Sequence, residues 1–88
     1  DYNSFGPRSA AKASRALELA RDVVAIELLC AAEAIEYHRP LRSGDAVERA
    51  HAAIRAEVPR LSQDRPPSPD IRRISRQIRD GDFSPMAR

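Results

Sequence analysis

The segment from Val23 to Ile35 is apolar around nearly the whole circumference of the helix that it predicts. A helix on a protein surface keeps one polar face, but only Glu27 and Glu33 interrupt the apolar run here. Such a helix belongs inside a bundle. Because little chain remains to surround it, we expect its neighbours to come from other subunits or from the rest of a longer protein. The side chains expected to contact these outside helices are Leu28, Leu29, Ala31, Ala32 and Ile35.

The size and charge of the chain exclude several classes of protein. A domain of 88 residues hides only about 60% of the surface that its unfolded chain exposes, so its core is small. The apolar segment is too short and too acidic to span a membrane. The chain begins without an initiator Met or an apolar signal segment, which predicts a fragment of a soluble, cytoplasmic protein. The net charge of +2 is nearly balanced, and 14 of the 15 basic residues are Arg, which indicates a composition bias.

The spacing of apolar residues predicts an all-α chain with one long helix and two shorter ones. We expect these helices to form part of a larger helical bundle. The expected elements are an irregular segment at 1–7, a long helix at 8–38, a second helix at 45–58, a third helix at 69–80 and a frayed tail at 81–88.

Proline and glycine set the ends of these helices. Pro7 has a suitable φ for a first helical turn, and Pro40 disfavours helix at the preceding residue. Ser68 is a candidate N-cap for the third helix, with a proline after it, and Gly81 is a natural C-terminal stop. The inner faces are expected to consist of Val47, Ala50, Ile54 and Val58 in the second helix and of Ile71, Ile74 and Ile78 in the third.

The third helix carries several arginines that suggest a phosphate-binding face. They are Arg72, Arg73, Arg76 and Arg79. Three aspartates at 70, 80 and 82 lie among them, and no aromatic residue is interleaved for base stacking. A solvated helix face is therefore the favoured interpretation, and we expect no nucleic-acid partner.

Cysteine and histidine give no catalytic or metal-binding pattern. Cys30 cannot form an internal disulfide and is expected to be a small buried side chain rather than a catalytic thiolate. His38 and His51 lack the spacing of a metal pair and are expected at the surface or at helix ends, so no metal site is predicted.

Glu27 and Glu33 are unusual because a carboxylate on an apolar helix must be paired, hydrogen-bonded or protonated. Two explanations remain open. Each carboxylate forms an ion pair with an Arg from a neighbouring helix, or it supports a functional site from outside. Tyr2 and Asn3 precede the long helix in an irregular segment, where functional residues often lie.

The order of these elements resembles the C-terminal part of the aromatic amino acid ammonia-lyase family, which includes histidine, phenylalanine and tyrosine ammonia-lyases and related aminomutases. The resemblance covers about residues 1 to 83. It is carried by Asp1–Gly6, Val24–Ala34, Arg39–Leu41, Val47–Pro59, Asp64–Pro66 and Pro69–Ile71.

This resemblance implies a homotetrameric, mainly helical enzyme that eliminates ammonia from an aromatic L-amino acid. Its electrophile is a methylidene-imidazolone group formed from Ala-Ser-Gly, a tripeptide that this chain lacks. The group would therefore form upstream in the full enzyme, and no catalytic residue is expected in this chain. In the family, a substrate-contacting pair precedes the position of Asp1, which implies that Tyr2 and Asn3 flank the substrate pocket. The substrate and the choice between elimination and an amino shift remain open.

Two functions follow from the sequence. The first is a C-terminal structural and oligomerisation segment of such a lyase, inactive alone, whose partners are the remainder of the enzyme and identical subunits. The alternative is a stand-alone helical interaction module without catalysis.

Overall fold

A computed structural model describes residues 5–87 of the chain, which form helices and connecting loops. The helices are α1 (Phe5–Tyr37), α2 (Asp45–Glu57), α3 (Ser68–Arg79) and the short 3-10 helix η2 (Ser84–Ala87). The prediction of an all-α chain with one long and two shorter helices is confirmed. The predicted tail differs in that η2 gives it one short helical turn.

The start of α1 lies three residues before the predicted position and includes Gly6 and Pro7. The first four N–H groups of a helix have no intrahelical acceptor, so the missing N–H of Pro7 costs nothing in the first turn. Residues 5–7 of the predicted irregular segment are therefore helical. At the other end, α1 stops at Tyr37, as expected from Pro40.

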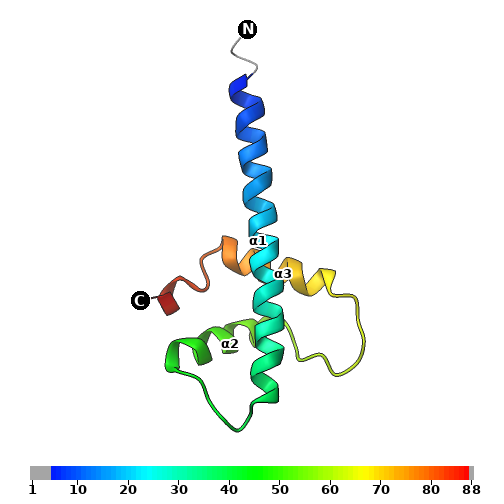
Figure 1. Cartoon of the computed structure of the whole chain (residues 1–88), viewed down its shortest axis with the longest axis vertical. Helices are drawn as coiled ribbons and strands as arrows, with labels where there is room; N and C mark the ends of the chain where they lie inside the picture. The colour runs from blue at the N-terminus through cyan, green and yellow to red at the C-terminus, as the bar shows by residue number, and fades with distance from the viewer. Residues whose placement is uncertain (1–4, 88) are drawn as a thin grey trace.

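The N-terminal half of α1 extends away from the other helices (Figure 1). Residues 6–20 are all exposed. The radius of gyration is 16.4 Å, whereas a compact domain of this length has about 12 Å. This half of α1 therefore gains no packing energy from the rest of the chain.

The core lies where α3 crosses the C-terminal half of α1 (Figure 1). Ala25 and Ala32 of α1 are fully buried there. Their small side chains leave room for Ile74 of α3, for Ile54 of α2 and for Val58, the C-cap of α2. Each large aliphatic side chain contributes about 1.5 to 3 kcal/mol when fully buried. With three such side chains among the described residues, the core is small, as expected from the length.

The predicted inner faces are mostly confirmed. Ile74 is fully buried, and Ile71 and Ile78 are partly buried against the same core. The prediction that Val47 faces the core is wrong, because this residue lies in the first turn of α2 and is 48% exposed. The core residues Ile54 and Val58 lie at the opposite end of α2, so Val47 is remote from this core.

The beginning of α3 differs from the predicted cap. Ser68 is the first helical residue and Pro67 is the N-cap, without a side-chain hydrogen bond. Asp70, in the first turn of α3, is 4% exposed and accepts hydrogen bonds from Arg65 (2.9 Å) and Arg73 (3.3 Å). Arg65 also donates to the carbonyl of Pro59 at 2.6 Å. These contacts hold the α2–α3 loop against α3.

Gly81 ends α3, as predicted, with a φ of +80°. The N–H of Gly81 donates to the carbonyl of Ile78 at 3.1 Å, and the N–H of Asp82 donates to that of Gln77 at 3.0 Å. This pair of bonds is the Schellman motif, which places a left-handed residue after the helix.

Gly81→Ala is expected to lower the free energy of unfolding by about 1 to 2 kcal/mol, because an L side chain is strained in the left-handed region. A Cβ would meet Ser84 Oγ at an ordinary 3.5 Å, so the cost is a backbone cost. Urea unfolding of the intact protein measures it. Gly6→Ala, inside α1 and with open space around it, is the control and should leave stability unchanged or raise it. Equal losses in both variants would contradict the assignment.

Candidate functional site

One exposed face of α1 carries a row of apolar side chains. Leu19, Val23, Ile26 and Cys30 follow one another at intervals of four, three and four residues, and we call them the outward stripe. All four are exposed, with Val23 at 57% and Ile26 at 44%. This spacing is typical of a helix that packs along a second helix. Cys30 was expected to be buried and is exposed, because it belongs to this face rather than to the core.

Several other residues in the apolar half of α1 are covered by this chain, which corrects part of the sequence-based expectation, although Val24 remains 44% exposed. Leu28 and Leu29 pack against the core, Ala32 is buried and Ile35 is partly buried, because α2 and α3 cover their side of the helix. Of the five residues expected to contact outside helices, only Ala31 is exposed. The outward stripe is therefore one continuous row of uncovered apolar side chains on α1, with Leu17 and Val24 exposed beside it.

Glu33 forms the interhelical ion pair that was one of its two explanations. Arg55 of α2 donates to Glu33 at 2.9 Å and to Glu36 at 2.8 Å, and the backbone N–H of Leu61 donates to Glu33 at 3.1 Å. The hydrogen bond from Arg55, together with its charge, holds the pKa of Glu36 below its usual value, although burial opposes this shift. Glu27, the other carboxylate of the apolar segment, is exposed. Arg55 thus joins α1, α2 and the following loop, a role that the sequence did not suggest.

The two histidines lie in different environments. His38 is exposed just after α1, as predicted. His51 was expected at the surface, but its side chain is only 11% exposed and its Nε2 lies 3.3 Å from a carboxylate oxygen of Glu36. The cause is the packing of α2 on α1, which brings this face of α2 against Glu36. No group of three metal-ligating side chains occurs within the described part of the chain.

Glu48 fixes the connection between α1 and α2. Arg39 donates to its two carboxylate oxygens at 2.9 and 2.8 Å, and the N–H of Ser43 donates to it at 2.8 Å. Arg42 lies 3.4 Å away. The hydrogen bonds from Arg39 and then from Ser43 lower the pKa of Glu48 to about 2. The N-cap Gly44 makes no side-chain hydrogen bond, so the chain just before α2 is held by a carboxylate from inside the helix.

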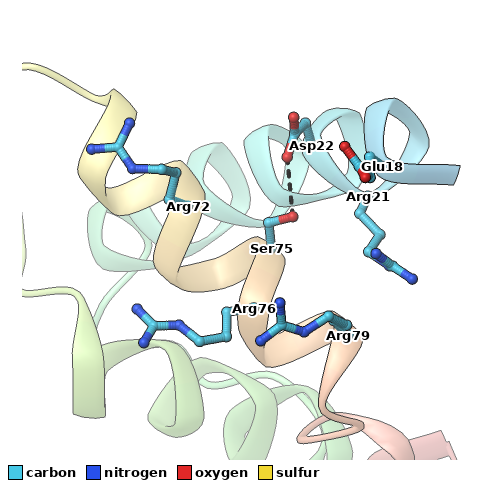
Figure 2. A pocket seen from close by; sticks show the side chains of 7 residues that line it. All are labelled: Glu18, Arg21, Asp22, Arg72, Ser75, Arg76 and Arg79. Atoms are coloured by element: carbon cyan, nitrogen blue, oxygen red, sulfur yellow. Dashed lines mark hydrogen bonds between the residues drawn. The ribbon is translucent and has the colours of Figure 1, made fainter. Parts of the chain in front are cut away.

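A polar groove lies between α1 and α3, and we call it the arginine groove (Figure 2). Its volume is about 540 Å³. Ser75 of α3 donates a hydrogen bond to Asp22 of α1 at 3.0 Å across it. The lining residues are Glu18, Arg21, Asp22, Arg72, Ser75, Arg76 and Arg79.

The composition of this groove corrects the predicted arginine face of α3. Arg73 is directed to Asp70 and does not line the groove, whereas Arg21 of α1 does. Two arginines of α3 form ion pairs with the aspartates that lie among them. Arg73 pairs with Asp70, and Arg79 pairs with Asp80 at 3.2 Å. Arg21 was missed because its contribution depends on where α3 crosses α1.

The two residues expected to flank a substrate pocket, Tyr2 and Asn3, lie outside the described residues, directly before α1. Within the described part, the structure brings together interhelical ion pairs, the outward stripe and the arginine groove. The ion pairs fix the positions of the helices, and the outward stripe and the arginine groove are exposed surface features.

Comparison with known proteins identifies the relatives of the chain. The model of the aromatic amino acid lyase family matches residues 1–56, which is more than half of the sequence. The chain belongs to the aromatic amino acid lyase family. The resemblance inferred from the sequence is therefore confirmed.

Similar lyases are histidine ammonia-lyases from several bacteria. The enzyme from Natranaerobius thermophilus is 40% identical over 92% of this chain and 16% of its own length. The enzyme from Anaeromyxobacter dehalogenans is 43% identical over the same shares, and that from Koribacter versatilis is 35% identical over all of this chain and 17% of its own. The chain thus spans about a sixth of the length of the lyases that it matches.

Two further observations concern this lyase segment. No solved structure matches the chain significantly. Within the described residues, no helix is long and apolar enough to cross a membrane.

The residues of this chain do not supply the precursor of the family's prosthetic group. The methylidene-imidazolone group forms from internal residues of the lyase, namely Ala-Ser-Gly. This sequence contains no Ala-Ser-Gly, so its own residues do not fit the formation of the group.

Proposed function

We propose that this chain is the C-terminal segment of a histidine ammonia-lyase and that it serves packing and assembly rather than chemistry. The choice of histidine is supported by the relatives, which are histidine ammonia-lyases 35 to 43% identical to the chain. The reaction of the whole enzyme would be the elimination of ammonia from L-histidine, which gives urocanate. In this proposal the enzyme is a cytoplasmic homotetramer.

The outward stripe is the observation that carries the assembly role. Its residues lie on the face of α1 away from the buried Ala25 and Ala32, so the core of this chain cannot cover them. Exposed apolar rows of this length mark surfaces that contact another protein surface. The partners are the remainder of the lyase and identical subunits.

The N-terminal half of α1 supports the same conclusion. It extends as a free helix, and an isolated helix of this length is only marginally stable in water. Packing against helices from outside the chain would supply the missing stabilisation. Tyr2 and Asn3, which precede this helix in the sequence, would then lie at the edge of the substrate pocket.

The isolated 88-residue chain is expected to release no urocanate from L-histidine, because the electrophile and the base must be held together in one site. The protein that carries this chain in its natural longer form is expected to release urocanate. It should not release cinnamate from phenylalanine or coumarate from tyrosine. Product formation is followed spectrophotometrically for all three substrates.

Turnover by the isolated chain would show that the segment contains the chemistry and would refute the proposal. Release of cinnamate or coumarate by the longer protein, without urocanate, would keep the lyase family but refute the choice of histidine.

A further inference from the structure

The arginine groove holds more positive charge than the described residues neutralise. Of its two acids, Glu18 lies 3.5 Å from Arg15, and Asp22 accepts a hydrogen bond from Ser75. Arg79 is paired with Asp80 outside the groove. Arg21, Arg72 and Arg76 make no ion pair with any residue that the structure describes. The groove therefore presents free guanidinium groups to whatever lies against it.

The arginines of α3 lie in one row along the helix. Arg72, Arg76 and Arg79 are spaced by four and three residues, which places them on one face over about 10 Å. Like charges at this spacing repel one another and destabilise a helix. Carboxylates from a partner would remove this repulsion and would form bidentate hydrogen bonds with the guanidinium groups.

The arrangement of the side chains favours an extended ligand. Figure 2 shows Arg72 and Arg21 directed to opposite ends of the groove, with Arg76 and Arg79 between them, so the guanidinium groups do not converge on one point. A single small anion could not contact them together. No aromatic side chain lines the groove, which disfavours single-stranded nucleic acid.

We propose that the arginine groove binds an acidic helical segment from another part of the assembled lyase. The carboxylates of this segment would be spaced by three or four residues, matching the row on α3. The inference rests on the proposed assembly role and adds the chemistry of one contact. Charged contacts of this kind lie beside apolar ones in protein interfaces and fix the register of the partners.

Carbodiimide cross-linking of the intact lyase tests this contact. Arg72→Lys and Arg76→Lys keep the positive charge and provide an amine that carbodiimide joins directly to a neighbouring carboxylate. The expected result is a cross-link from position 72 or 76 to acidic residues spaced by three or four positions outside this chain, identified by mass spectrometry. Arg49→Lys, next to its partner Asp45 on α2, is the matched control and should link only to Asp45.

The salt dependence of assembly gives a second measurement. The double substitution Arg72→Gln with Arg76→Gln is expected to weaken assembly about tenfold at low salt and to flatten its salt dependence, whereas Arg49→Gln should change neither. Cross-links confined to Glu18 and Asp22, or an unchanged salt dependence, would overturn the inference. If Val23→Glu on the outward stripe dissociates the lyase in the same experiments, the assembly role stands without this contact. If Val23→Glu has no effect either, both proposals fail.

Discussion

Val23→Glu is expected to weaken assembly of the intact lyase about a thousandfold, because it places a carboxylate in the centre of the outward stripe. Burial of a valine contributes about 1.5 to 3 kcal/mol, and burying an unpaired polar or charged group costs more. A combined loss of about 4 kcal/mol corresponds to three orders of magnitude in affinity. Light scattering of the intact protein over a dilution series should show smaller species at concentrations where the unchanged protein remains assembled.

Val47→Glu is the matched control. Val47 is also a half-exposed valine on a helix, 48% exposed against 57% for Val23, but it lies on α2 away from the outward stripe. Its substitution should leave the assembly unchanged. Equal behaviour of the two variants, whether both dissociate or neither does, would show that the outward stripe is not the contact surface.

The helices could be predicted from the sequence because their ends are set by local chemistry. Pro40 and Gly81 act through their own backbone angles and therefore end their helices in almost any tertiary environment. The start of α1 was less well defined, because Pro7 is tolerated anywhere in a first turn. The burial of Ile74 and Ile54 also followed from helical spacing, since each helix has one apolar face.

The orientation of α1 could not be predicted in the same way. Its second half is apolar in almost every direction, so periodicity does not distinguish the side that meets α3 from the side that faces outward. The structure shows that the side with Ala25 and Ala32 is the inner one. Small side chains let two helices approach closely, but alanines occur all around α1, so this cue identifies the inner face only once the crossing is known.

The polar contacts depended still more on tertiary structure. Asp70 has the position of an acid at a helix N-terminus, and its burial arises only because Arg65 returns from the preceding loop. The partner of Glu33 could be predicted as an arginine from another helix, but not as Arg55, since this requires the register of α2 against α1. The arginine groove likewise exists only because α3 crosses α1 near Arg21.

Ile74→Ala is expected to lower the free energy of unfolding of this segment by about 2 to 5 kcal/mol, because it removes a fully buried side chain and leaves a cavity. Ile74 joins α3 to Ala25 and Ala32, and few other large side chains are fully buried in this core. The other apolar side chains of α3 that pack against this core, Ile71 and Ile78, are only partly buried. Hydrogen exchange of the intact lyase, read for the peptides of α3, measures the local loss of stability.

The effect should be confined to the core and should not reach the outward stripe. Ile71→Ala, on the same helix but only partly buried, is the matched control and should cost clearly less. Faster exchange of α3 after Ile74→Ala, with assembly retained, is expected because the core and the outward stripe lie on opposite faces of α1. Unchanged exchange in α3 would mean that contacts from outside this chain, rather than the core at Ile74, hold the helix in place.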